Sequence, residues 1–231
     1  MASIEWLEGG ARVVGLDLRV PDAAILDSAL HAEIVGIDAP FGWPEAFIAF
    51  LSAHRDDRQG PPDPNPDAAR RILAFRETDR VVAAATGNQP LSVATNLLGL
   101  TAMRASGLLA ALRDRGEPVE RAGFGRVVEV YPAASMRCWG LPVVPYKGTN
   151  PAGLTGMVDA LLGAAPWLDL GSFEHSCRTS DDAFDAVIAS LTARSRAIGN
   201  WIPPGDDQRT LASREGWIVL PSSDLNALPS L

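Results

Sequence analysis

The chain has 231 residues, of which 47% are hydrophobic and 21% are charged. This composition supplies enough apolar material for a folded core and argues against a disordered chain. Twenty basic residues against 28 acidic residues give a net charge of -8, which argues against a general surface for binding polyanions but leaves a local basic groove or an acidic metal site open.

The first 40 residues predict a hairpin, a helix and a strand. Residues 2–7 and 11–18 are expected to be paired strands, because the glycines of the turn at 8–10 supply the positive φ that a tight turn needs. A proline favours the start of a helix at 22–30. The nearly all-apolar stretch 33–38 is typical of a strand inside a sheet that is covered on both faces.

The rest of the chain alternates helices and strands. A stretch rich in proline, aspartate and glycine at 55–67 predicts a loop, either an exposed connector or one that lies over a site. The clearest helix is 180–198, whose apolar residues recur at helical spacing and whose N-terminus Thr179 or Ser180 can cap. Further helices are predicted at 43–54, 91–115 and 153–162, strands at 126–131 and 216–220, and a helical turn at 68–71.

This order of elements predicts an α/β fold, with a mixed sheet and helices on both of its faces. The two cysteines, Cys138 and Cys177, lack CxxC spacing, so we expect free thiols rather than a disulfide scaffold or a zinc site. No segment has the roughly 18 to 20 apolar residues of a membrane span, and the N-terminus lacks the basic region of a signal peptide. A cytoplasmic protein without a membrane partner is therefore expected.

Acidic residues that interrupt apolar patterns are the candidates for chemistry. Asp38 ends a predicted buried strand, Glu129 lies inside the strand RVVEVY, and Asp181, Asp182 and Asp185 begin the amphipathic helix. Ligands of open α/β sheets bind beyond the carboxyl ends of the strands. Carboxylates gathered there stay ionised most easily around a cation, and Mg²⁺ or Mn²⁺ favours such hard oxygen ligands.

Each acid also has a purely structural interpretation. Asp38 can cap the turn before Trp43, and Glu129 can lie exposed on an edge strand or pair with Arg126. The acids at the start of the helix can simply be favoured by the helix macrodipole. Among them Asp185 borders the apolar stripe and is the best placed to face inward.

Short segments along nearly the whole chain resemble the DUF429 family, described as predicted nucleases with an RNase H-like fold. These segments are IDAPFGWP at 37–44, RETD at 76–79, VVEVYPAA at 127–134, YKG at 146–148, DDAFDAVIASLTA at 181–193 and EGWIVLP at 215–221. The resemblance implies a single RNase H-like domain over residues 1–231 that contains the loop at 55–67.

The resemblance also implies a site. Its acids would be Asp38, Glu129 and Asp185, which act in catalysis and, with Asp182, hold Mg²⁺ or Mn²⁺. Candidate substrate contacts are Arg76, Thr78, Asp79, Tyr131 and Lys147. Arg76 can contact a phosphate or, equally, hold Asp79 or a neighbouring loop. Tyr131 and Lys147 can equally be a packed ring and a solvated amine.

The chain departs from the family pattern at its N-terminus. Members of this fold begin with a strand that carries an acid, whereas ASIEW resembles the family's second strand, so the first strand is expected to be missing. The leading hypothesis is a metal-dependent nuclease with nucleic acid as substrate. The alternative is a non-catalytic binding or regulatory protein on the same fold. A phosphotransferase is less favoured, because only ATGNQ at 85–89 hints at a phosphate loop.

Overall fold

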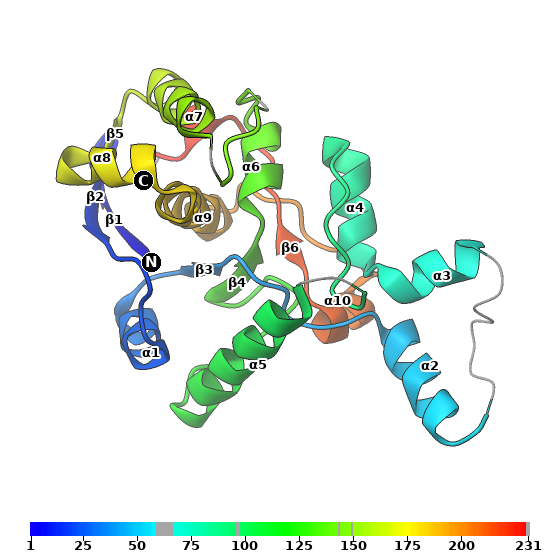
Figure 1. Cartoon of the computed structure of the whole chain (residues 1–231). Coiled ribbons are helices and arrows are strands. Elements are labelled where there is room, and N and C mark those ends of the chain that lie inside the picture. The colour runs from blue at the N-terminus through cyan, green and yellow to red at the C-terminus, as the bar shows by residue number, and fades with distance from the viewer. Residues whose placement is uncertain (59–66, 96–97, 143, 149, 230–231) are drawn as a thin grey trace. The chain divides into compact units, whose positions relative to one another are not determined.

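The computed structural model describes residues 1–58, 67–95, 98–142, 144–148 and 150–229 (Figure 1). Within these ranges the chain is α/β, and its strands form two three-stranded sheets with the orders β1-β2-β5 and β3-β4-β6. Most of the loop predicted at 55–67, namely residues 59–66, lies outside the described residues. None of the helices in the described ranges is long and apolar enough to span a bilayer.

The helices and strands follow one another along the chain. In order they are β1 (Ala2–Leu7), β2 (Gly10–Leu16), α1 (Asp22–His31), β3 (Val35–Ile37), α2 (Glu45–Arg55), α3 (Asp67–Ala74), α4 (Glu77–Thr86), α5 (Leu98–Asp114), β4 (Val127–Val130), α6 (Pro132–Cys138), α7 (Pro151–Ala164), β5 (Leu168–Asp169), the 3-10 turn η1 (Gly171–Phe173), α8 (Glu174–Thr179), α9 (Asp181–Ala197), α10 (Arg209–Glu215), β6 (Ile218–Val219) and the 3-10 turn η2 (Leu225–Ala227).

Most predicted elements are confirmed, with shifted ends. The hairpin β1-β2 and the helices α1, α2, α7 and α9 form close to where their patterns indicated. Helix α5 begins at Leu98 instead of Leu91, and α3 is a full helix instead of a single turn. The sequence patterns missed α4, α6, α8 and α10. These helices have ten residues or fewer, too short for apolar periodicity to mark them.

The chain forms two compact units that are interleaved in the sequence. Unit 1 comprises Met1–Asp38, Val130–Ile202 and Val219–Leu231, and unit 2 comprises Ala39–Glu129 and Pro203–Ile218. The chain therefore passes from one unit to the other four times, and neither unit is a continuous segment.

Unit 1 is built on the sheet β1-β2-β5 and on helix α9. β1 and β2 are antiparallel, and β2 and β5 are parallel. Along β1 the side chains alternate between partly buried and exposed, as expected for a sheet with one covered face. On the exposed face Arg12 lies opposite Glu5 and bonds Asp169 at 3.1 Å. The prediction of helices on both faces therefore does not hold for this sheet, because every second residue of β1 is exposed.

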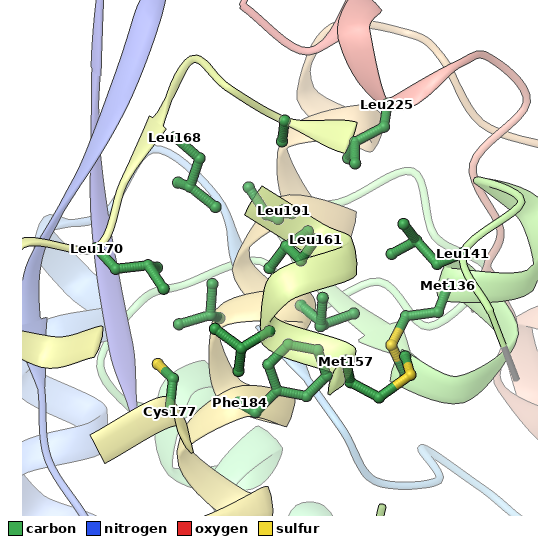
Figure 2. Packing of buried hydrophobic residues seen from close by; sticks show 14 of the residues in the cluster. Met136, Leu141, Met157, Leu161, Leu168, Leu170, Cys177, Phe184, Leu191 and Leu225 are labelled. Atoms are coloured by element: carbon green, nitrogen blue, oxygen red, sulfur yellow. The ribbon is translucent and has the colours of Figure 1, made fainter. Parts of the chain in front are cut away.

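The hydrophobic core of unit 1 gathers around α9. Phe184, Val187 and Leu191, from the predicted apolar stripe, have no exposed surface. They pack with residues of α7 such as Met157 and Leu161, as Figure 2 shows. Ser180 caps the helix by accepting a hydrogen bond from the Ala183 amide at 3.3 Å, which confirms one of the two predicted caps.

Strand β3 is shorter and less buried than its apolar sequence predicted. Only Val35–Ile37 are in strand geometry, and all three are half-buried. Gly36 is the point at which α9 approaches the strand, because a Cβ atom there would lie 2.7 Å from the carbonyl oxygen of Ala189. The glycine thus allows the backbones of β3 and α9 to pack closely.

Candidate functional site

A buried carboxylate, Asp185, forms the centre of the first candidate site. It lies in the second turn of α9, beside the apolar stripe, and is only 7% exposed. The Tyr146 hydroxyl donates a hydrogen bond to Asp185 Oδ1 at 2.7 Å, and the Lys147 ammonium bonds Oδ2 at 2.8 Å. Burial raises the pKa of Asp185, although Lys147 and Tyr146 oppose the rise. The carboxylate is thus removed from water and held by two neighbouring residues.

The segment Tyr146–Gly148 is fixed against the start of α9. The Tyr146 ring is buried and meets the Phe184 ring edge-on, with centroids 5.6 Å apart. The Gly148 amide donates to Asp181 Oδ2 at 3.1 Å. These contacts place the tyrosine hydroxyl beside Asp185, while the Lys147 side chain stays 60% exposed.

The charges of two further carboxylates, Asp38 and Asp181, raise pKa values in the same group of residues. Burial and Asp185 raise the pKa of Tyr146, and Asp38, at the end of β3, adds to this rise. Burial lowers the pKa of Lys147, but the charges of Asp185, Asp38 and Asp181 outweigh it and leave the pKa raised. We call these five residues, Asp38, Tyr146, Lys147, Asp181 and Asp185, the Asp185 cluster.

The structure separates the two acids that begin α9. Asp181 belongs to the Asp185 cluster, whereas Asp182 is exposed and its charge acts on the amino group of Met1. The family resemblance had implied Asp182, together with Asp185, as a metal ligand. Spacing alone could not separate the two acids, because residues three and four positions from Asp185 both share a helix face with it. The predicted contact Tyr131 is half-buried.

The second candidate site is a buried ion network around Arg76 in unit 2. Arg76, Asp79 and Glu129 are at most 2% exposed. The Arg76 guanidinium donates to both oxygens of Asp79, to both oxygens of Glu129 and to the carbonyl of Glu215, at 2.8 to 3.2 Å. These bonds use every N–H donor of the guanidinium. Of its two predicted roles, the structure shows Arg76 holding Asp79.

Both carboxylate oxygens of Glu129 also accept hydrogen bonds. Its Oε1 accepts a bond from Arg76, and its Oε2 accepts one from Arg76 and one from the Phe41 amide at 2.9 Å. Burial raises the pKa of Glu129, opposed by Arg76 and by the Phe41 amide. Gly216 leaves the room for this carboxylate, since a Cβ atom there would lie 2.6 Å from Oε2. The partner of Glu129 is therefore Arg76, and not Arg126 as considered from the sequence.

Glu215 and Thr78 complete the network through backbone groups. The Glu215 carboxylate accepts the amides of Glu45 and Glu77, both at 2.8 Å, and so caps the N-termini of α2 and α4 together. Burial raises the pKa of Glu215, opposed by these two amides. Thr78 accepts a hydrogen bond from the Ile218 amide at 2.8 Å. These contacts give the segments RETD, VVEVY and EGW a joint structural role.

The predicted site residues are thus distributed over two groups. Asp38, Asp182, Asp185, Tyr131 and Lys147 belong to unit 1, and Arg76, Thr78, Asp79 and Glu129 belong to unit 2. Among the residues that the structure describes, no group of three or more His, Cys, Asp or Glu side chains is arranged to hold a metal ion.

The motifs on which both groups rest run through most of the chain, and the family match covers all of them except EGWIVLP at 215–221. The model of the family described as "Protein of unknown function (DUF429)" matches residues 1–209. The chain belongs to the DUF429 family. This confirms the resemblance drawn from the short segments. A comparison with curated proteins found no match, and neither did a comparison with solved structures.

Proposed function

We propose that this DUF429 protein is a divalent-metal-dependent phosphodiester hydrolase, a nuclease, with its site at the Asp185 cluster of unit 1. One observation carries the proposal. A cation, the Lys147 ammonium, lies 2.8 Å from the buried carboxylate Asp185, and the charge of Asp38 acts on the same ammonium. The protein thus has a place for a positive charge beside one buried carboxylate, and the charge of a second carboxylate also acts there.

The residues of the cluster suit Mg²⁺ or Mn²⁺. These ions are bound in proteins through one or two carboxylates, and water and substrate phosphate complete the shell. Asp185 and Asp38 would supply the carboxylate oxygens. Such an ion polarises a phosphoryl oxygen and lowers the pKa of a bound water.

The other residues of the cluster have supporting tasks in this proposal. Tyr146 holds Asp185 Oδ1 and so fixes the direction of Oδ2. Asp38 is exposed, so a substrate can reach this side of the cluster. The net charge of -8 repels a phosphodiester, so positive charge at the site is required for the substrate to approach. Metal binding by Glu129, as the family resemblance implies, would require that carboxylate to exchange its bonds with Arg76 for the ion.

The proposal is tested with a cleavage assay on single- and double-stranded DNA and RNA in Mn²⁺. We expect cleavage by the unchanged chain, and its loss in Asp38→Asn and Asp185→Asn. Asp182→Asn is the matched control, because Asp182 starts the same helix but lies outside the cluster, and it should retain activity. Thermal melts show whether each variant is folded. Cleavage that survives in both Asp38→Asn and Asp185→Asn would refute the assignment of the site.

The competing function is that of a non-catalytic binding or regulatory protein on the same fold. It is favoured by the observation that Asp185 and Glu129 are each already paired with a cation of the protein. Absence of both cleavage and Mn²⁺ binding in the unchanged, folded chain would support this function over the nuclease.

A further inference from the structure

We propose that Lys147 is a built-in competitor of the metal ion: its ammonium occupies Asp185 Oδ2 when no ion is bound and is displaced when a divalent cation binds. The inference rests on the proposed metal site at the Asp185 cluster, and it adds a regulatory role for a residue whose side chain had been assigned only to substrate. Ammonium and metal ion require the same carboxylate oxygen, so they cannot both bind Asp185 Oδ2 at once.

Lys147 is the only lysine among the 231 residues, whose other basic side chains, histidines apart, are all arginines. An arginine at a carboxylate forms a rigid fork of bonds, as Arg76 does with Asp79 and Glu129. Lysine is a single point charge on a flexible stem and leaves a carboxylate more readily. The cation at Asp185 is therefore of the more easily displaced type.

The surroundings of Lys147 allow the displacement. The side chain is 60% exposed, so the ammonium can enter water at little cost. The main chain on either side stays anchored, through the Tyr146 hydroxyl on Asp185 and the Gly148 amide on Asp181. Movement is thus restricted to the lysine stem, and the ammonium remains near the site after it leaves Asp185. There it can contact an oxygen of a bound phosphate.

Removal of the competitor should strengthen metal binding. We expect Lys147→Met, which keeps the length of the stem, to bind Mn²⁺ about three- to tenfold more tightly, since partly exposed charge pairs make contributions of this order. Lys147→Arg should bind Mn²⁺ more weakly than the unchanged chain, because the guanidinium fork holds Asp185 more firmly. Lys147→Met should also cleave more slowly, because the phosphate contact is lost. A purely structural lysine would not move affinity and cleavage in opposite directions.

Mn²⁺ binding is measured by electron paramagnetic resonance or calorimetry on the full chain and on Lys147→Met, Lys147→Arg and the control Asp182→Asn. Tighter binding by Lys147→Met alone supports the inference. Equal or weaker binding by Lys147→Met, or no binding by any form, overturns it. Tighter Mn²⁺ binding by Lys147→Met without cleavage by any form would support the inference and refute the nuclease. Metal-dependent cleavage together with an unchanged Mn²⁺ affinity of Lys147→Met would support the nuclease and refute the inference.

The single lysine also allows a direct observation of the displacement. Reductive methylation with ¹³C-formaldehyde labels Lys147 and the terminal amine only, and Lys147→Arg identifies the lysine signal in the NMR spectrum. We expect Mg²⁺ to shift the lysine signal in the unchanged chain and to leave it in place in Asp185→Asn. A lysine signal that stays in place while calorimetry records Mg²⁺ binding would overturn the inference.

Discussion

Arg76 and Glu129 show how the same residue types serve two kinds of chemistry. A guanidinium fork fits a phosphate and a carboxylate equally well, and a carboxylate on a strand suits a metal ion or an arginine. In this protein all the donors of Arg76 are directed at Asp79, Glu129 and the Glu215 carbonyl, at nearly complete burial. Removal of one member leaves buried charges without a partner, so the network is a strong determinant of the stability of unit 2.

Arg76→Met should lower the free energy of unfolding by about 3–5 kcal/mol, the usual cost of leaving buried carboxylates unpaired. Urea denaturation followed by circular dichroism measures the change. Arg80→Met is the matched control, because Arg80 lies in α4, the helix that follows Arg76, and is a partly exposed arginine that pairs with Glu77. This variant should lower the free energy of unfolding by less than about 1 kcal/mol. Equal stability of the two variants would contradict the role given to the Arg76 network.

At the scale of elements, backbone approach decides how helices and strands meet. The carbonyl of Ala189 on α9 lies where a side chain at Gly36 of β3 would begin. Glu215, at the end of α10, holds the first residues of α2 and α4 through their amides. In both cases one residue fixes the relation between elements that are far apart in the sequence.

Gly36→Ala should destabilise unit 1 by about 1–3 kcal/mol, because the added methyl group forces α9 away from β3. Gly156→Ala is the opposite case. Gly156 lies exposed inside α7 with no atom within 4 Å of an added Cβ, so alanine should stabilise the helix by about 0.5–1 kcal/mol. Thermal melts of the two variants should shift in opposite directions, and a neutral Gly36→Ala would disprove the close approach.

At the scale of the whole molecule, the interleaving of the two units makes the C-terminal segment essential to both. Unit 2 takes Glu215 from residues 203–218, and unit 1 takes the buried Leu225 and Leu228 from residues 219–231. The family match ends at residue 209. The contacts show that described residues beyond this match help to form both units.

A chain ending at residue 209 should therefore fail to fold cooperatively. It lacks the carboxylate that caps α2 and α4, and it leaves part of the core of unit 1 unfilled. Circular dichroism and a thermal melt would show a broad or absent transition. A chain ending at residue 229 is the control and should melt like the full chain. A cooperative melt of the shorter chain would refute the role of the C-terminal segment.

The sequence by itself determined the local features. A glycine turn between two short strands predicted the hairpin β1-β2, and helical spacing predicted α9 with its Ser180 cap, since these signals depend only on neighbouring residues. The short segments also sufficed to assign the DUF429 family. Apolar neighbours singled out Asp38, Glu129 and Asp185 as unusual acids, and Asp185 and Glu129 are indeed buried.

Only the tertiary structure decided the partner of each acid. Glu129 meets Arg76 from 53 positions away, and Asp185 meets Tyr146 from 39 positions away. Such contacts depend on how the elements pack, and no local pattern records them. The residues around an acid in the sequence do not reveal whether its partner in the fold is a metal ion, a guanidinium or an ammonium. Burial requires that some partner be present, and the fold selects which one.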